Sequence, residues 1–225
     1  MTTRRMAAVA VKIVVLLAVL FLPAGTLRWW RAWAFIATVA TAWLVSRNTA
    51  LRHSDELLAA RRSGFHPSQP RADKIAVSFL IAVYIIQVLL IPLDVLHLHL
   101  LPKPGIIVSS LGMLLFLLGW TVITLSFREN NFAVPAVRCQ LERHQVVIDS
   151  GLYGIVRHPL YAGMLMMFIG APLWLESTAA SIFALAHLSV LMARISIEEN
   201  FLRRNLAGYD EYMCRVRYRL LPFVW

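Results

Sequence analysis

Long apolar blocks divide this chain and constrain its fold more than any other feature of the sequence. A helix needs about 20 apolar residues to cross a hydrocarbon core of ~30 Å. Hydrophobic residues make up 59% of the chain and charged residues 15%, whereas a soluble domain carries roughly a quarter charged residues. The sequence therefore predicts an all-α fold, a polytopic helical membrane bundle that forms one membrane domain over residues 1–225. The predicted spans are 7–24, 29–46, 75–96, 105–126, 160–175 and 178–197.

The number of transmembrane helices stays open between five and six. At ~1.5 Å per residue the block 160–175 reaches only about 24 Å, which is short for a span. One interpretation is six spans with both termini inside, and the other is five spans with a re-entrant or tilted hairpin over 160–197. In both cases we expect the last helix to end near Gly208, followed by a cytoplasmic C-terminal tail. A short interfacial helix is also predicted within 50–64.

The basic residues lie mainly in alternate connections and in the tail, and the formal net charge is +10. This distribution is the positive-inside bias of membrane proteins, so it predicts that these connections and both termini are cytoplasmic. It does not favour nucleic acid as a partner. The short chain and compact loops are typical of a bacterial cytoplasmic membrane protein. The residues concerned are Arg47, Arg52, Arg61, Arg62, Arg71 and Lys74, then Arg128, Arg138, Arg143 and Arg157, and finally Arg203, Arg204, Arg215, Arg217 and Arg219.

The segment GLYGIVRHPLYAG, residues 151–163, places two basic side chains at the start of an apolar block. Proline is favoured at the first helical position, so Pro159 predicts a helix start that faces the cytoplasm. The N-terminus of a helix carries a partial positive charge and free backbone N–H groups. Arg157 and His158 add side-chain donors at the same point. We therefore predict an anion site here, with a plain interfacial helix start and snorkelling basic side chains as the alternative.

Two adjacent carboxylates, Glu198 and Glu199, follow the last apolar block and share a broad helical face with Leu202. Carboxylates so near a membrane segment are costly unless a cation meets them. The structural alternative is that Arg194 and Arg203, each four residues from one glutamate, pair with them. If these pairs do not form, the anion site at Pro159 and the two glutamates together suit a zwitterion. Its carboxylate would meet Arg157 and the helix N-terminus, and its ammonium would meet Glu198 or Glu199.

Together these segments resemble the isoprenylcysteine carboxyl methyltransferase family and its bacterial relatives. The family pattern is Gly-x-Tyr, Arg-His-Pro-x-Tyr, a Glu-Glu pair on the last helix, and a following Tyr-x-x-Tyr. The resemblance covers residues 124–225, including the segment NNFAVPAVRCQLERHQVVIDSG that precedes the first motif. The motifs correspond to Gly151, Tyr153, Arg157, His158, Pro159, Tyr161, Glu198, Glu199, Tyr209 and Tyr212.

The resemblance implies an integral-membrane enzyme that uses S-adenosylmethionine, a zwitterion of the kind that the two sites suit. It implies that Arg157 and Glu199 are catalytic, and that Tyr209, Tyr212 and Leu202 are candidates for the adenine pocket. The expected cofactor-binding residues are Tyr153, His158, Pro159, Tyr161, Gly163, Glu198, Glu199, Leu202, Tyr209 and Tyr212.

Methyl transfer from an activated sulfonium depends mainly on in-line alignment of donor and acceptor. A carboxylate acceptor needs no base. Arg157 could orient such an acceptor, in which case His158 and the helix N-terminus would bind the cofactor carboxylate. We expect residues 124–225 to form the cofactor-binding region and residues 1–123 the acceptor side. The acceptor is expected to be lipophilic or lipidated and to enter from the bilayer, among membrane lipids.

Two other functions remain as alternatives. A phospholipid N-methyltransferase would use the same donor, but its amine acceptor would need to be deprotonated. A sterol-reductase-like membrane enzyme would bind NADPH near a similar tail, although Glu198 and Glu199 suit a 2′-phosphate poorly. His97 and His99 are not accompanied by a cluster of acidic or cysteine ligands, so no metal is expected.

Overall fold

The computed structural model describes residues 3–49, 66, 67 and 69–225, and within these residues it contains helices and no strands. The predicted all-helical class is therefore confirmed, while the interfacial helix predicted within 50–64 lies outside the described residues. The helices are α1 (Thr3–Ala24), α2 (Trp30–Thr49), α4 (Arg71–Leu93) with its π-helical extension η1 (Asp94–Leu98), α5 (Ile106–Glu129), the 3-10 turns η2 (Leu141–Arg143) and η3 (Gly151–Gly154), α6 (Pro159–Trp174), α7 (Thr178–Ile182), α8 (Ala184–Asn205) and α9 (Tyr209–Arg215).

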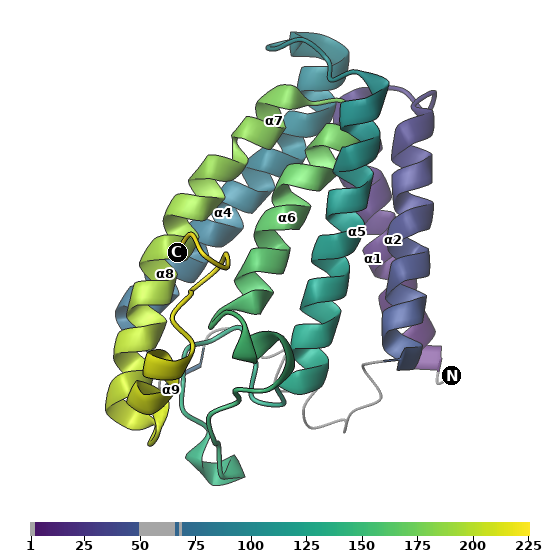
Figure 1. Cartoon of the computed structure of the whole chain (residues 1–225). Coiled ribbons are helices and arrows are strands. Elements are labelled where there is room, and N and C mark those ends of the chain that lie inside the picture. The colour runs from purple at the N-terminus through teal and green to yellow at the C-terminus, as the bar shows by residue number, and fades with distance from the viewer. Residues whose placement is uncertain (1–2, 50–65, 68) are drawn as a thin grey trace.

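The long helices lie side by side in an elongated bundle, with α6 between α5 on one side and α4 and α8 on the other (Figure 1). The end of α5, the start of α6, the end of α8 and α9 meet at one end of the bundle, which we call the site end. The α1–α2 turn, η1 and α7 lie at the opposite end. Thus the two sequence segments that carry the motifs are brought to the same end of the molecule.

Helix α6 packs most extensively against α5, and glycines make the two backbones approach closely. A Cβ atom added at Gly119 would lie 2.6 Å from the carbonyl oxygen of Gly163, and one added at Gly170 would lie 2.5 Å from that of Gly112. Small residues at a membrane helix interface permit this approach. Gly163, an expected cofactor-binding residue, is therefore a packing residue in the structure, where it contacts Gly119 and Ile123 of α5.

The apolar helices support an integral membrane protein. Among the described residues, three segments are long and apolar enough to cross a membrane: Arg71–Leu98, Ile106–Glu129 and Thr178–Asn205. Two apolar segments are shorter, namely Ile13–Ala24 and α6, which is 16 residues long. Three spans are thus supported by length and composition, and the further two or three spans predicted from the sequence remain a prediction.

An ion pair between Arg31, which is buried, and Glu176, which is partly exposed, lies at the opposite end of the bundle. The Arg31 Nε atom lies 3.1 Å from Glu176 Oε1, and Arg31 Nη1 donates to the carbonyl of Trp174 at 2.9 Å. The guanidinium also lies over the rings of Trp30 and Trp174, with its carbon 5.0 and 4.8 Å from their centroids. The pair joins the start of α2 to the connection between α6 and α7, which lies at the end of the bundle opposite the site end (Figure 1).

Candidate functional site

A cavity of about 420 Å³ opens at the site end, where the connection between α5 and α6 folds over the ends of α4, α6 and α8. Its lining comes from both halves of the chain. Pockets for small molecules have volumes of about 300–1,000 Å³, so this cavity is large enough for a cofactor. The lining residues are Val77, Leu80 and Ile81 of α4, Phe127 of α5, Asn130, Phe132 to Arg138 and Gln145 to Ile148 of the connection, Tyr153, Arg157, His158, Leu160, Tyr161 and Met164, then Arg194, Glu198, Leu202, Leu206, Tyr209 and Tyr212.

Helix α6 begins at Pro159, as the sequence predicts, and the chain just before it is held by the C-terminal tail. The backbone N–H of Arg157 donates to the carbonyl of Tyr218 at 2.9 Å, and that of His158 donates to the carbonyl of Arg219 at 2.9 Å. Pro159 itself has no backbone N–H, so no donor is left unpaired at the first position of the helix. These two hydrogen bonds fix the tail beside the helix start and direct the two side chains.

Glu199 is the centre of a buried ionic cluster at this point. Its Oε1 accepts from Arg157 Nε at 2.7 Å and lies 3.2 Å from His158 Nε2, while its Oε2 accepts from Arg219 Nε at 3.0 Å. The Arg157 Nη1 atom donates to the carbonyls of Val216 and Arg217 at 2.7 and 2.8 Å. We call Arg157, Glu199 and Arg219 the tail lock. Both oxygens of Glu199 are engaged by protein groups, and this side chain is only 4% exposed.

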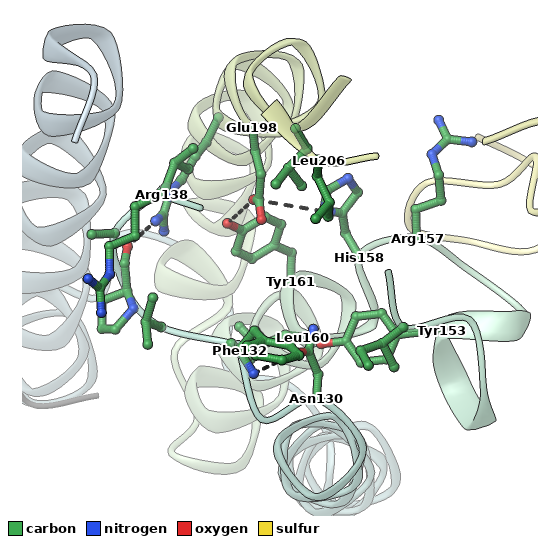
Figure 2. A pocket seen from close by; sticks show the side chains of 18 of the residues that line it. Asn130, Phe132, Arg138, Tyr153, Arg157, His158, Leu160, Tyr161, Glu198 and Leu206 are labelled. Atoms are coloured by element: carbon green, nitrogen blue, oxygen red, sulfur yellow. Dashed lines mark hydrogen bonds and ion pairs between the residues drawn. The ribbon is translucent and has the colours of Figure 1, made fainter. Parts of the chain in front are cut away.

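Glu198 has a different environment, although it is the next residue. Its Oε2 accepts from the hydroxyl of Tyr161 at 2.6 Å and lies 3.9 Å from His158 Nδ1. The side chain is 25% exposed and lines the cavity. In Figure 2 the side chains of Glu198, Tyr161 and His158 point toward one another, whereas that of Arg157 points away from them. The carboxylate available to a ligand is therefore that of Glu198.

The ion pairs considered as a structural alternative do not form as expected, because each arginine has a different carboxylate partner. Arg194 Nε lies 3.0 Å from Asp73 Oδ1, and Arg203 Nε lies 2.6 Å from Asp210 Oδ1. Asp73 belongs to α4, so the first pair joins two helices that are distant in the sequence. The alternative in which Arg194 and Arg203 form ion pairs with the two glutamates is therefore not seen among the described residues.

Two tyrosines of α9 form the neutral wall of the cavity. The rings of Tyr209 and Tyr212 have centroids 5.6 Å apart, and the Tyr212 hydroxyl donates to the carbonyl of Tyr153 at 2.9 Å. Burial, which disfavours the phenolate, is the main cause that raises the pKa of both hydroxyls. Both rings therefore present an uncharged aromatic surface to the cavity.

The structure brings most of the expected site residues to the cavity, and it leaves three of them outside. Pro159 and Gly163 pack within the bundle, and Glu199 belongs to the tail lock. Those that line the cavity are Tyr153, Arg157, His158, Tyr161, Glu198, Leu202, Tyr209 and Tyr212. Sequence reasoning missed Asn130, Phe132, Arg138 and Arg194 as residues of the cavity wall, and Asp73 as the partner of Arg194. The only signal was that the segment before the first motif belongs to the resemblance.

Comparisons with known proteins show to which proteins the sequence is similar. The family model described as phospholipid methyltransferase matches residues 107–208, which include α5, α6, α8 and the connection over the cavity. A protein from Oryza sativa subsp. indica named "probable protein-S-isoprenylcysteine O-methyltransferase" is 28% identical over 196 residues, which cover 84% of this chain and 100% of the relative. Protein-S-isoprenylcysteine O-methyltransferase B of Arabidopsis thaliana is 28% identical over 112 residues, which cover 48% of this chain and 57% of the relative.

The bundle, the cavity and these matches together define an integral-membrane methyltransferase. Within that class, the chain is similar to proteins named protein-S-isoprenylcysteine O-methyltransferase, the family that its sequence motifs resemble. A methyltransferase requires a methyl donor, and the cavity at the site end is the candidate place for it.

Proposed function

We propose that this protein uses S-adenosylmethionine as its methyl donor and binds it in the cavity at the site end. The observation that carries the proposal is the carboxylate of Glu198, which lies in a largely apolar and aromatic cavity and is held by Tyr161 and His158. A partly exposed carboxylate held in this way is suited to an ammonium group, because a charge-assisted hydrogen bond is about twice as strong as a neutral one.

The chemistry of the cavity fits the other parts of the donor as well. The rings of Tyr209 and Tyr212, with Leu202 and Leu206 beside them, provide an uncharged surface for the adenine. His158 and Arg138 are basic side chains on the cavity wall and suit the carboxylate. The guanidinium of Arg157 is engaged by Glu199 and two carbonyls, which favours His158 over Arg157 for this contact.

Catalysis would consist mainly of alignment. S-adenosylmethionine supplies a methyl group on a sulfonium that is already activated for displacement. Glu198, held by Tyr161, and the tyrosines of α9 would hold the donor in one orientation. A positional error of about 1 Å can reduce the rate ~100-fold, so rigid support of these side chains matters as much as their charge. The tail lock supplies that support by fixing the tail to the start of α6.

The acceptor is proposed to be a lipophilic carboxylate that enters from the bilayer. Apolar residues of two helices line part of the cavity, namely Val77, Leu80 and Ile81 of α4 and Met164 of α6, and they would form its membrane side. Residues 124–225 would bind the donor and residues 1–123 would contribute to the acceptor side, which agrees with the position of α4 in the wall. The names of the rice and Arabidopsis relatives favour an S-prenylated cysteine as the acceptor.

A phospholipid N-methyltransferase is the second candidate, and it is favoured by the description of the matched family model. Its acceptor would be the primary amine of a lipid headgroup. Vesicles that contain phosphatidylethanolamine test this candidate directly, and an S-prenylated N-acetylcysteine tests the first one. Methylation of one probe without the other decides between the two acceptors.

The positions of the basic residues support a proposal for the orientation in the membrane. We propose six spans, namely α1, α2, α4, α5, α6 and α8, with both termini and the site end in the cytoplasm. The observations in support are the basic connections in the sequence and the common location of α9 and the α5–α6 connection at one end (Figure 1). Labelling of single cysteines in the 97–103 loop from the cytoplasmic side of vesicles would contradict this orientation.

The donor site is tested by titrating the detergent-solubilised protein with S-adenosylmethionine and, separately, with NADPH. We expect saturable binding of S-adenosylmethionine only. Glu198→Gln should weaken it at least about tenfold, because a hydrogen bond to a charged group contributes roughly 1.5–3 kcal/mol. Glu211→Gln, on the exposed surface of α9, is the matched control and should leave the affinity unchanged. Equal affinity in both variants would reject Glu198 as the ammonium partner.

A further inference from the structure

A second hollow of the bundle lies between α2 and α5. It is a groove of about 750 Å³, and none of the described residues that line it also lines the cavity at the site end. Helix α5 takes part in both spaces, because Phe127 lines the cavity whereas Leu125 and Arg128 line the groove. The groove is therefore a separate feature, and the donor and acceptor proposed above leave it without a role.

The groove forms because α2 and α5 lie side by side but pack loosely (Figure 1). They contact each other far less extensively than α5 and α6 do. A hydrogen-bonded link joins them, in which Trp120 Nε1 donates to Ser46 Oγ at 2.8 Å and Ser46 Oγ lies 3.0 Å from Thr124 Oγ1. On the α2 side the wall includes Ala37 and Ala42, whose small side chains leave the space open.

The rim of the groove is apolar and open to the outside of the bundle. Val45 of α2 and Leu117 and Leu125 of α5 line the groove, and all three are exposed. In a membrane protein such side chains face lipid, since a hydrocarbon core surrounds the apolar part of the helices. The groove is therefore accessible to an acyl chain from the side.

The length and position of the groove match one leaflet of a bilayer. From Leu117 to Arg128 helix α5 rises about 17 Å at ~1.5 Å per residue. Half of a hydrocarbon core of ~30 Å is about 15 Å. Arg128 lies in the last turn of α5, at the site end of the bundle (Figure 1). The groove therefore runs from the membrane surface at the site end to about the middle of the bilayer.

Arg128 supplies the charge of the groove and is free to bind an anion. Its side chain is exposed, and no described residue forms a hydrogen bond or an ion pair with it. The adjacent Glu129 is engaged elsewhere, because its carboxylate accepts a hydrogen bond from the hydroxyl of Ser150. The described lining of the groove contains no carboxylate. A guanidinium in such surroundings suits a phosphate, whose oxygens can accept two parallel hydrogen bonds from it.

Only an amphiphile uses both parts of this site. A free phosphate would meet the guanidinium and leave the groove empty, whereas an uncharged lipid would fill the groove and leave the guanidinium unpaired. A phospholipid places its phosphate at the membrane surface and its acyl chain beneath it, which is the order of Arg128 and the groove. Basic pockets between transmembrane helices at the cytoplasmic side bind acidic lipid headgroups, and each basic side chain near the surface favours anionic lipids.

We propose that the groove between α2 and α5 binds an anionic phospholipid, with its phosphate on Arg128 and one acyl chain along the groove toward Leu117. The lipid occupies the space that the small side chains of α2 leave, and so joins α2 to α5. This site goes beyond the proposed function, because it takes no part in methyl transfer and is separate from the cavity that would hold the methyl donor.

Trp120 lines the groove and reports on its occupant. Brominated acyl chains quench the fluorescence of a tryptophan that they touch. The full-length protein is placed in phosphatidylcholine nanodiscs that contain increasing fractions of dibrominated phosphatidylglycerol or, separately, of dibrominated phosphatidylcholine. Each variant is measured with Trp120 present and with Trp120→Phe, and the difference is the signal from the groove. The variants are Arg128→Gln and, as its matched control, Arg204→Gln, which neutralises an exposed arginine at the end of α8.

In the wild-type protein we expect half of the Trp120 signal to be quenched at a fraction of phosphatidylglycerol roughly fivefold below that of phosphatidylcholine. In Arg128→Gln the two lipids become equivalent, whereas Arg204→Gln keeps the preference. Ala42→Leu, which fills the groove, lowers the quenching by both lipids. Ala82→Leu, at an exposed position of α4, is its matched control and leaves the quenching unchanged.

Equal quenching by the two lipids in the wild-type protein overturns the proposal, as does a phosphatidylglycerol preference that persists in Arg128→Gln. Loss of the preference in Arg204→Gln to the same extent shows a general effect of surface charge and overturns it as well. Relief of the quenching by an S-farnesylated N-acetylcysteine would give the groove to the acceptor and not to a phospholipid. The measurements require neither a methyl donor nor turnover, so their outcome is independent of the proposed function.

Discussion

Glu198 and Glu199 are neighbours in the sequence, yet they serve two different regions of the molecule. Glu198 lines the cavity and is held by one hydroxyl, with a quarter of its side chain exposed. Glu199 is buried and meets Arg157, His158 and Arg219. The comparison shows that a motif of two identical residues can combine a ligand contact with a structural anchor, and that mutation of the two should give different phenotypes.

The difference arises from the geometry of α8. Successive residues of a helix point about 100° apart, since there are 3.6 residues per turn. The two carboxylates share a broad face, as the spacing predicts, but one points into the cavity and the other toward the start of α6. The environment of Glu199 is completed by the C-terminal tail, because residues 216–219 supply two carbonyls and one guanidinium to the ionic cluster around it.

The largest expected effect is that of Arg157→Ala. It leaves Glu199 buried with fewer partners and removes the donors that bind the carbonyls of Val216 and Arg217. Loss of one partner of a buried ion pair costs about 3–5 kcal/mol. We expect a large decrease in melting temperature in detergent and a C-terminal tail that trypsin cleaves rapidly, with donor binding lost as a consequence.

Glu199→Gln should resemble Arg157→Ala in stability, and not Glu198→Gln. The sequence motif alone makes the opposite prediction, a folded protein in which Glu199→Gln removes a cofactor contact. Thermal unfolding and donor titration on the same samples separate the two. A Glu199→Gln protein of normal melting temperature that fails to bind S-adenosylmethionine would restore Glu199 as a ligand residue.

The next effect is that of Glu198→Gln, the other side of the comparison. We expect the affinity for S-adenosylmethionine to fall at least about tenfold, because the substitution removes the charge-assisted hydrogen bond proposed between Glu198 and the ammonium group. The melting temperature should change little, because this side chain is partly exposed and has one strong partner. A decrease in melting temperature as large as that of Arg157→Ala would show that the two glutamates form one structural cluster.

A smaller effect is expected for Arg219→Gln, which removes the tail's own contribution to the lock. Its side chain is 33% exposed, so the pair with Glu199 is partly screened by solvent and is expected to contribute about 1 kcal/mol. The tail should become more susceptible to trypsin without global unfolding. Arg217→Gln is the control, because Arg217 is exposed and contributes to the lock through its carbonyl. Equal susceptibility in both variants would argue against the side-chain contact.

The smallest effect is expected for Tyr161→Phe, which removes only the hydroxyl that donates to Glu198 at 2.6 Å. The ring that stacks on His158, with centroids 5.5 Å apart, remains. A net hydrogen bond contributes about 0.5–1.5 kcal/mol, so donor affinity should fall roughly two- to tenfold. Isothermal titration with S-adenosylmethionine measures this. An unchanged affinity would mean that Glu198 is oriented by the rest of its environment.

Much of the fold could be predicted from the sequence, because its signals are local. Apolar blocks of spanning length gave the helical membrane class, and Pro159 marked the start of α6 because a proline is tolerated at a first helical position. The helix before the tail ends at Asn205, close to the expected Gly208, where the backbone turns with a positive φ of 81°. The methyltransferase class followed from motifs within residues 151–212, which are short local patterns that can be recognised without knowledge of the fold.

Only the tertiary structure decided which side chains share a site. Asp73 and Arg194 pair across 121 residues of sequence, and the tail bonds to residues 157 and 158 from 61 residues away. Such partners depend on how α4, α6 and α8 cross, and this is set by the close glycine contacts of α5 and α6 and by the packing of α4 on α8. A helical pattern records which face of a helix is apolar, but not what lies opposite that face. For that reason the sequence by itself determined the class of this protein, and the packing alone decided that Glu198 faces the cavity while Glu199 holds the tail.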